Sequence, residues 1–301
     1  MTRMAAELAE SLRASGARRI AFLGLAKNAG KTTALTAVLA ELHRSGVVAG
    51  ATSAGRDGEE FDAITGEPKP RFRVYPGQLV ASAATTFESA SFPVEELATL
   101  PFPTRFGPVQ LRRAAGEGEI EVIGPSTASQ MARTAAALEA AGAELVLLDG
   151  AVGRRAFAAG RVCDGIVLSV GMSAGETFPA VLAAASAAVE LIRLDRPEEG
   201  ATRRDVDGAV TAASLREMTL SAGESLVAED FTAIFLKPAE RRELAERGVS
   251  LAVRRPARLI AVTANPSAPA RPPLPAARFL EAVAQQITGV PIFDLVADLR
   301  S

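Results

Sequence analysis

Cysteine and histidine are almost absent from this sequence of 301 residues, which contains one of each. The single cysteine, Cys163, excludes an internal disulfide, and the single histidine, His43, excludes a metal site built from several histidines. We expect structural roles for both. His43 falls at the end of an expected helix, and Cys163 borders an apolar segment.

Long apolar runs and an excess of charge of one sign are also lacking. No uninterrupted apolar span reaches about 18 residues, so no membrane-spanning helix is expected. The formal net charge is −2, which provides no basic field for nucleic acid or an anionic membrane. Residues 1–19 carry Glu7 and Glu10 and are expected to form a helix rather than a signal peptide. These features favour a cytoplasmic protein.

Residues 20–33 contain the pattern on which the functional prediction depends. The run Ile20–Leu25 is apolar and long enough for a buried strand. It is followed by Ala-Lys-Asn-Ala-Gly, by Lys-Thr-Thr, and by an Ala/Leu-rich segment with helical periodicity. Strand, small-residue loop, Gly-Lys-Thr and helix is the layout of a phosphate-binding P-loop, or Walker A motif.

Each residue type in this loop suits a triphosphate. Small residues at Asn28, Ala29 and Gly30 would let several backbone N–H groups converge on phosphate oxygens. The helix that follows adds its unpaired N–H groups and the positive end of its dipole. Lys31 would reach the β- and γ-phosphates, and the Thr32 hydroxyl would ligate Mg²⁺. The residues of this loop that are predicted to bind the nucleotide are Lys27 to Thr33.

The loop departs from the strict motif at two positions. The glycine expected five residues before Gly30 is Leu25 here, with Gly24 one residue earlier, and Lys27 is an additional lysine inside the loop. Lys27 is either a solvated loop lysine or a second cation on the phosphates. In some P-loop proteins a loop lysine acts on the nucleotide, often across a dimer. The sequence leaves both interpretations open. The second interpretation would be compatible with a homodimer.

Two acidic residues are predicted beside the phosphates. Residues 47–52 read as a second strand that leads to Asp57, and Asp149 follows four apolar residues in the manner of a Walker B strand. Ligands of parallel α/β sheets bind beyond the carboxyl ends of the strands. Asp57 and Asp149 would therefore join Thr32 in holding Mg²⁺, directly or through water, and would be catalytic together with Lys31. The alternative for Asp57 is an acidic solvated loop.

Asn265 ends a late strand over residues 259–265 and is followed by Pro266. An amide at a strand end can read a purine edge, because it both donates and accepts hydrogen bonds. Asn265 is therefore a candidate nucleotide-binding residue. The alternative is an ordinary turn asparagine before proline.

The remaining pattern predicts an α/β protein with a mostly parallel sheet and helices on both faces. Residues 63–107 lack a clean period and are expected to form a long functional loop or lid. Short alternating runs at 108–113 and 119–124 predict a hairpin or two consecutive strands. The expected domains are a P-loop NTPase core, an α/β insertion or subdomain, and a C-terminal completion of the core, over residues 1–194, 195–256 and 257–301.

With the P-loop, Asp57, Asp149 and Asn265 in this order, the chain resembles P-loop NTPases of the signal-recognition/MinD/dethiobiotin-synthetase class. Longer strings are similar to the P-loop subunit of the reactivating factor that accompanies adenosylcobalamin-dependent lysine 5,6-aminomutase and ornithine aminomutase. These strings are Gly24-Leu-Ala-Lys-Asn-Ala-Gly-Lys-Thr-Thr33, Thr52-Ser-Ala-Gly-Arg-Asp-Gly-Glu59, Asp149-Gly-Ala151, Asn265-Pro266 and Pro291-Ile-Phe-Asp294.

The resemblance implies an ATPase that uses Mg²⁺ and ATP to drive release of damaged cobalamin from a partner, either an aminomutase or a second reactivase subunit. The cobalamin would belong to the partner, since His43 lacks the context of a cobalamin-binding loop. A second hypothesis is a metabolic enzyme of the dethiobiotin-synthetase kind, which uses ATP to activate a carboxylate or carbamate. The lack of Cys/His clusters and of an Asn-Lys-x-Asp signature weighs against a third, a GTP-binding metallochaperone.

Overall fold

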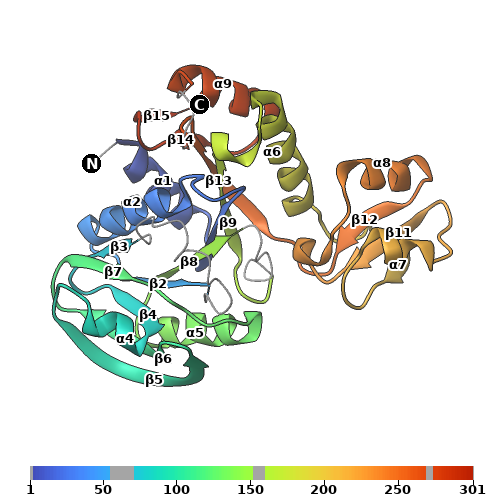
Figure 1. The fold of residues 1–301 in the computed structure, drawn as a ribbon. Coiled ribbons are helices and arrows are strands. Elements are labelled where there is room, and N and C mark those ends of the chain that lie inside the picture. The colour runs from blue at the N-terminus through green and yellow to red at the C-terminus, as the bar shows by residue number, and fades with distance from the viewer. Residues whose placement is uncertain (1–2, 55–70, 152–159, 269–273, 301) are drawn as a thin grey trace.

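The computed structural model describes residues 3–54, 71–151, 160–268 and 274–300. Over these residues the chain is organised around a 10-stranded sheet (Figure 1). In spatial order the sheet consists of β15 (Leu299–Arg300), β14 (Ile292–Asp294), β13 (Arg258–Asn265), β9 (Gly165–Gly171), β1 (Arg19–Gly24), β8 (Leu145–Ala151), β2 (Ala49–Ser53), β4 (Leu79–Ala83), β6 (Gly107–Ala114) and β5 (Val94–Thr104).

The strands of this sheet are mostly parallel. Every neighbouring pair from β14 to β4 is parallel, whereas β15, β6 and β5 pair antiparallel at the two edges. The predicted α/β class with a mostly parallel sheet is confirmed. Because β8 lies directly beside β1 in register, the ends of these two strands meet at one edge.

Helices cover both faces of the sheet. Successive side chains of β1 point to opposite faces and pack against different helices. Ile20 and Phe22 are buried in the cluster that includes α1 (Arg3–Ala14) and α2 (Lys31–Arg44). Ala21 and Leu23 are buried in the opposite cluster. That cluster includes residues of α5 (Ala128–Ala140), α6 (Phe178–Ile192) and α9 (Ala276–Gln286).

The helix expected after the Gly-Lys-Thr loop forms directly behind it and has His43 in its last turn, as the sequence predicts. α2 begins at Lys31 and ends at Arg44, just before Gly46. The Thr127 hydroxyl caps α5 by accepting a hydrogen bond from Gln130 N at 3.2 Å, as side-chain caps do. Among the described residues, none of the helices combines the length and the apolar composition that crossing a membrane requires.

The expectation of a long loop over residues 63–107 is wrong from residue 71 onward. That part forms β3 (Arg71–Val74), β4, α4 (Ala84–Glu88) and β5. β5 lies last in the sheet order and shows register shifts against β6, so its alternation is irregular. Pro101 and Pro103 fit such a strand, because an edge strand needs ladder hydrogen bonds on one side only. Residues 63–70 lie outside the described residues.

The two short runs that follow are consecutive strands that belong to different sheets. β6 joins the large sheet beside β4 and β5. β7 (Gly118–Glu121) instead pairs with β3 in a two-stranded antiparallel sheet. The hairpin alternative is therefore wrong.

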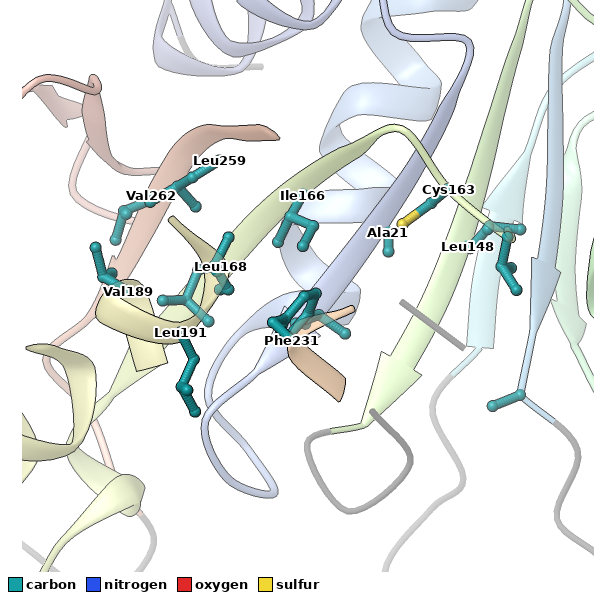
Figure 2. Close-up of a cluster of buried hydrophobic side chains, with 14 of the residues drawn as sticks. Ala21, Leu148, Cys163, Ile166, Leu168, Val189, Leu191, Phe231, Leu259 and Val262 are labelled. Carbon is teal, nitrogen blue, oxygen red and sulfur yellow. The ribbon is translucent and has the colours of Figure 1, made fainter. Parts of the chain in front are cut away.

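A second parallel sheet forms between α6 and β13. It consists of β10 (Thr202–Asp205), β11 (Glu224–Ala228) and β12 (Ser250–Val253), with α7 (Ala212–Arg216), the 3₁₀ turn η3 (Phe231–Ala233) and α8 (Pro238–Glu246). Phe231 attaches this sheet to the core. It is 4% exposed and shares a buried cluster with Ile166, Leu168 and Leu191 (Figure 2).

Candidate functional site

The loop between β1 and α2 has a backbone shaped to surround an anion. Asn28 has φ 61° and Gly30 has φ 95°, whereas Ala29 between them is not in the positive-φ region. Alternating φ signs turn successive N–H groups to one side, which is the geometry of an anion-binding nest. Gly30 precedes α2, and no side chain among the described residues caps this helix through a hydrogen bond. The first N–H groups of α2 are thus available to a ligand.

The carboxyl end of β9 contacts this loop through a backbone hydrogen bond and close packing. The Leu25 N–H donates to the Ser169 carbonyl at 3.0 Å. Ala29 packs on Gly171 so closely that a Cβ at position 171 would lie 2.6 Å from the Ala29 Cα. Only glycine permits this approach, so Gly171 fixes how near the loop lies to the sheet. Gly171 ends the apolar run of β9, and a glycine at the end of a buried strand is the sequence signal that could have identified this position.

Lys31 and Asp149 meet at the centre of the site. The Lys31 Nζ lies 2.7 Å from the Asp149 Oδ1, and the two side chains are 20% and 8% exposed. Asp149 is aligned with Phe22 of β1 and with Ser53 of β2, so neighbouring strand ends bring it to the loop. A short, charge-assisted contact with little exposure is stronger than an ordinary surface pair.

Asn265 also reaches the loop, but its contacts differ from those of a free base-reading amide. Its Nδ2 donates to the Asn28 carbonyl at 3.1 Å, and its Oδ1 accepts from the Ser267 N–H at 3.1 Å. The second bond is the turn contact that the alternative interpretation expects. The first joins β13 to the loop between β1 and α2, a connection that the sequence did not predict.

The other candidate residues lie near this centre or fall outside the described residues. Thr32 and Thr33 lie in the first turn of α2, half-buried and exposed respectively. Lys27 and Asn28 are exposed on the loop. Asp57 falls in the segment 55–70, outside the described residues.

The donors at this edge fit a magnesium ion bound together with a nucleotide. In the described ranges, no group of three or more His, Cys, Asp or Glu side chains could hold a metal ion by itself. Magnesium in nucleotide sites takes only one or two carboxylates, with phosphate oxygens and water completing the shell. Asp149 and the Thr32 hydroxyl supply donors of this kind, so the residues present fit the ion.

Cys163 and His43 lie outside the site. Burial raises the pKa of the Cys163 thiol to about 12, so the thiol stays protonated and unreactive at neutral pH. The His43 ring stacks on Tyr75, with ring centroids 5.1 Å apart.

Comparisons of the chain with protein-family models, with curated proteins and with solved structures find no match.

Proposed function

We propose that this protein is a P-loop NTPase that binds Mg-ATP in the loop between β1 and α2. The observation that carries the proposal is the combination of the nest at residues 28–30 with the Lys31–Asp149 pair beneath it. Backbone N–H groups, a helix N-terminus and one lysine supply the donors that a triphosphate needs. The adjacent carboxylate supplies the metal side of such a site.

The ion pair suggests how the residues act when the nucleotide binds. Lys31 would leave Asp149 and donate to the phosphates, while Asp149 and Thr32 would turn to the metal. The metal ion, when bound, would neutralise charge that develops on the phosphates. The N–H groups of the nest would hold the phosphate oxygens without reorganisation, because the loop is already in the required conformation.

The activity that we propose for this site is ATP hydrolysis that remodels a cobalamin-dependent aminomutase. This part rests on the similarity of the sequence strings to the P-loop subunit of an aminomutase reactivating factor. It predicts slow ATP hydrolysis that the mutase stimulates. If a small carboxylic acid stimulated turnover and the mutase did not, the dethiobiotin-synthetase interpretation would replace it.

Replacing Lys31 tests the site itself. We expect Lys31→Ala to weaken Mg-ATP binding at least about a hundredfold, because it removes the one lysine that can replace the Asp149 contact with phosphate contacts. Isothermal titration calorimetry measures the affinity, and release of inorganic phosphate measures turnover. Lys237→Ala is the matched control, since Lys237 is an exposed lysine at the start of α8. Unaltered affinity and turnover in Lys31→Ala would refute the proposal.

A further inference from the structure

The two polar ends of the Asn265 amide are both engaged within the protein. The Nδ2 donates to the Asn28 carbonyl and the Oδ1 accepts from the Ser267 N–H, each at 3.1 Å. These two partners fix which way the amide points, because a flipped amide would set donor against donor and acceptor against acceptor. The orientation of the Asn265 amide is therefore set by the Asn28 carbonyl and the Ser267 N–H.

The bond to Asn28 determines where the next N–H points. In a trans peptide the C=O of one residue and the N–H of the next are directed to opposite sides of the chain. With its C=O held at Asn265, the peptide between Asn28 and Ala29 must direct the Ala29 N–H away from Asn265. This N–H is one of those that the nest offers to an anion.

Asn265 also contacts the other left-handed residue of the loop. A Cβ at position 30 would lie 3.3 Å from the Asn265 Cβ, so Gly30 packs directly against this side chain. Asn265 is in register with Gly171 on the neighbouring strand β9, and Gly171 packs against Ala29. Two aligned positions on adjacent strands thus hold the three residues of the nest, 28–30.

We infer that Asn265 is a positioning residue for the phosphate-binding loop, and that it acts by holding the 28–29 peptide rather than by reading the purine base. The inference rests on the proposed function, since it assigns a role in binding a triphosphate. It predicts that Asn265 contributes equally to the affinity for every ligand that carries the same triphosphate. A base-reading residue would contribute only when a base is present.

Inorganic tripolyphosphate separates these two roles, because it has the phosphates of ATP and no base. The affinities of the wild type, Asn265→Ala and Ser267→Ala for Mg-ATP, Mg-GTP and Mg-tripolyphosphate are measured by calorimetry. We expect Asn265→Ala to weaken all three by the same factor, about tenfold, the effect of one lost hydrogen bond. Ser267→Ala keeps the backbone N–H that Asn265 uses and is expected to leave all three affinities unchanged.

Thermal unfolding of each variant separates positioning from a purely structural role. A structural role would lower the melting temperature and leave the affinity of the folded protein unchanged, which would overturn the inference. Loss of ATP affinity with unchanged tripolyphosphate affinity would overturn it in favour of base reading. A wild-type protein that binds neither ATP nor tripolyphosphate would instead refute the proposed function. The two failures are therefore distinguishable.

Discussion

The large sheet and the small sheet of β10, β11 and β12 both carry charged side chains at the carboxyl ends of parallel strands. At the small sheet, Arg254 contacts Asp205 at 3.1 Å and Glu229 at 3.3 Å. Arg161 and Arg255 contact the same Glu229 at 3.1 and 3.0 Å. These side chains are 28–66% exposed. They form a solvated network in which opposite charges satisfy one another.

At the large sheet fewer charged side chains meet, and the main difference is the backbone conformation of the adjoining loop. One lysine and one carboxylate meet with little exposure, directly below a loop with two left-handed residues. A network of exposed ion pairs contributes little free energy and offers no set of unpaired donors. The comparison teaches that two sheets with charges at the same edge differ in the conformation of the adjoining loop, and it is this conformation on which the proposed anion site depends.

Among the variants that test this comparison, Gly171→Ala is expected to have the largest effect on nucleotide affinity. Gly171→Ala would place a Cβ 2.6 Å from the Ala29 Cα, so the loop must move away from the sheet. We expect Mg-ATP affinity to fall at least about tenfold and the free energy of unfolding to fall by about 1–3 kcal/mol. Calorimetric titration and urea unfolding measure the two quantities.

Gly165→Ala is the matched control for Gly171→Ala, because Gly165 begins the same strand at the end remote from the β1–α2 loop. Its added Cβ would meet mainly the Ile260 Cδ1 at 2.3 Å, the end of a side chain that can rotate. We expect a stability loss without a change in nucleotide affinity. Equal affinities for the two variants would show that close packing on β9 does not shape the nest.

A smaller effect tests the Lys31–Asp149 pair. In the wild type, ATP without Mg²⁺ must separate Lys31 from Asp149 while no metal ion takes the carboxylate. Asp149→Asn removes the charge that holds Lys31. The ratio of the dissociation constant in EDTA to that in Mg²⁺ should therefore fall about tenfold, a change of 1.4 kcal/mol.

Asp205→Asn provides the matching measurement at the small sheet, since Asp205 is also an acid with a basic partner at a strand end. We expect the ratio of dissociation constants to be unchanged in Asp205→Asn. A ratio in Asp149→Asn that also equals the wild-type ratio would remove Asp149 from the metal side of the site.

The strand and the helix on either side of the β1–α2 loop could be predicted because their sequence signals are local. An apolar run, a loop of small residues and a periodic helix follow one another within residues 20–44, and the structure has β1 and α2 there. The proximity of Lys31 and Asp149 depends on β8 pairing beside β1. The rule that ligands gather at strand ends anticipates this proximity, but it does not give the ion pair itself.

The strands between residues 71 and 104 could not be read in the same way. β5 has a partner on one side only and shifts register twice. Its apolar and polar residues therefore do not alternate regularly, and it contains two prolines, so the sequence does not mark it as a strand. The bond from Asn265 to Asn28 joins residues 237 positions apart in the chain. Such a contact follows from strand order and loop conformation, which residue types at single positions do not encode.

The smallest expected effect concerns Glu229 and the pH dependence of stability. Burial raises the pKa of Glu229, but hydrogen bonds from Arg161 and Arg254 outweigh it and leave the pKa below the ordinary 4.5. A carboxyl with a lowered folded-state pKa contributes stability above about pH 4.5, and that contribution is lost as the pH falls through the lowered value. Glu229→Gln should therefore reduce stability at pH 7 by at most about 1 kcal/mol, because the network is exposed.

Urea unfolding of Glu229→Gln and wild type at pH 7 and pH 3, in low salt and in 1 M salt, measures this contribution. We expect the difference between the two proteins to be smaller at pH 3 than at pH 7, because the stability contributed by a lowered carboxyl pKa is lost as the pH falls below the ordinary 4.5. It should also shrink in 1 M salt, where exposed charges are screened. Mg-ATP affinity should be the same in both, because the small sheet offers its charges to one another. A loss of affinity in Glu229→Gln would contradict the comparison, since it would mean that the two carboxyl edges act as one site.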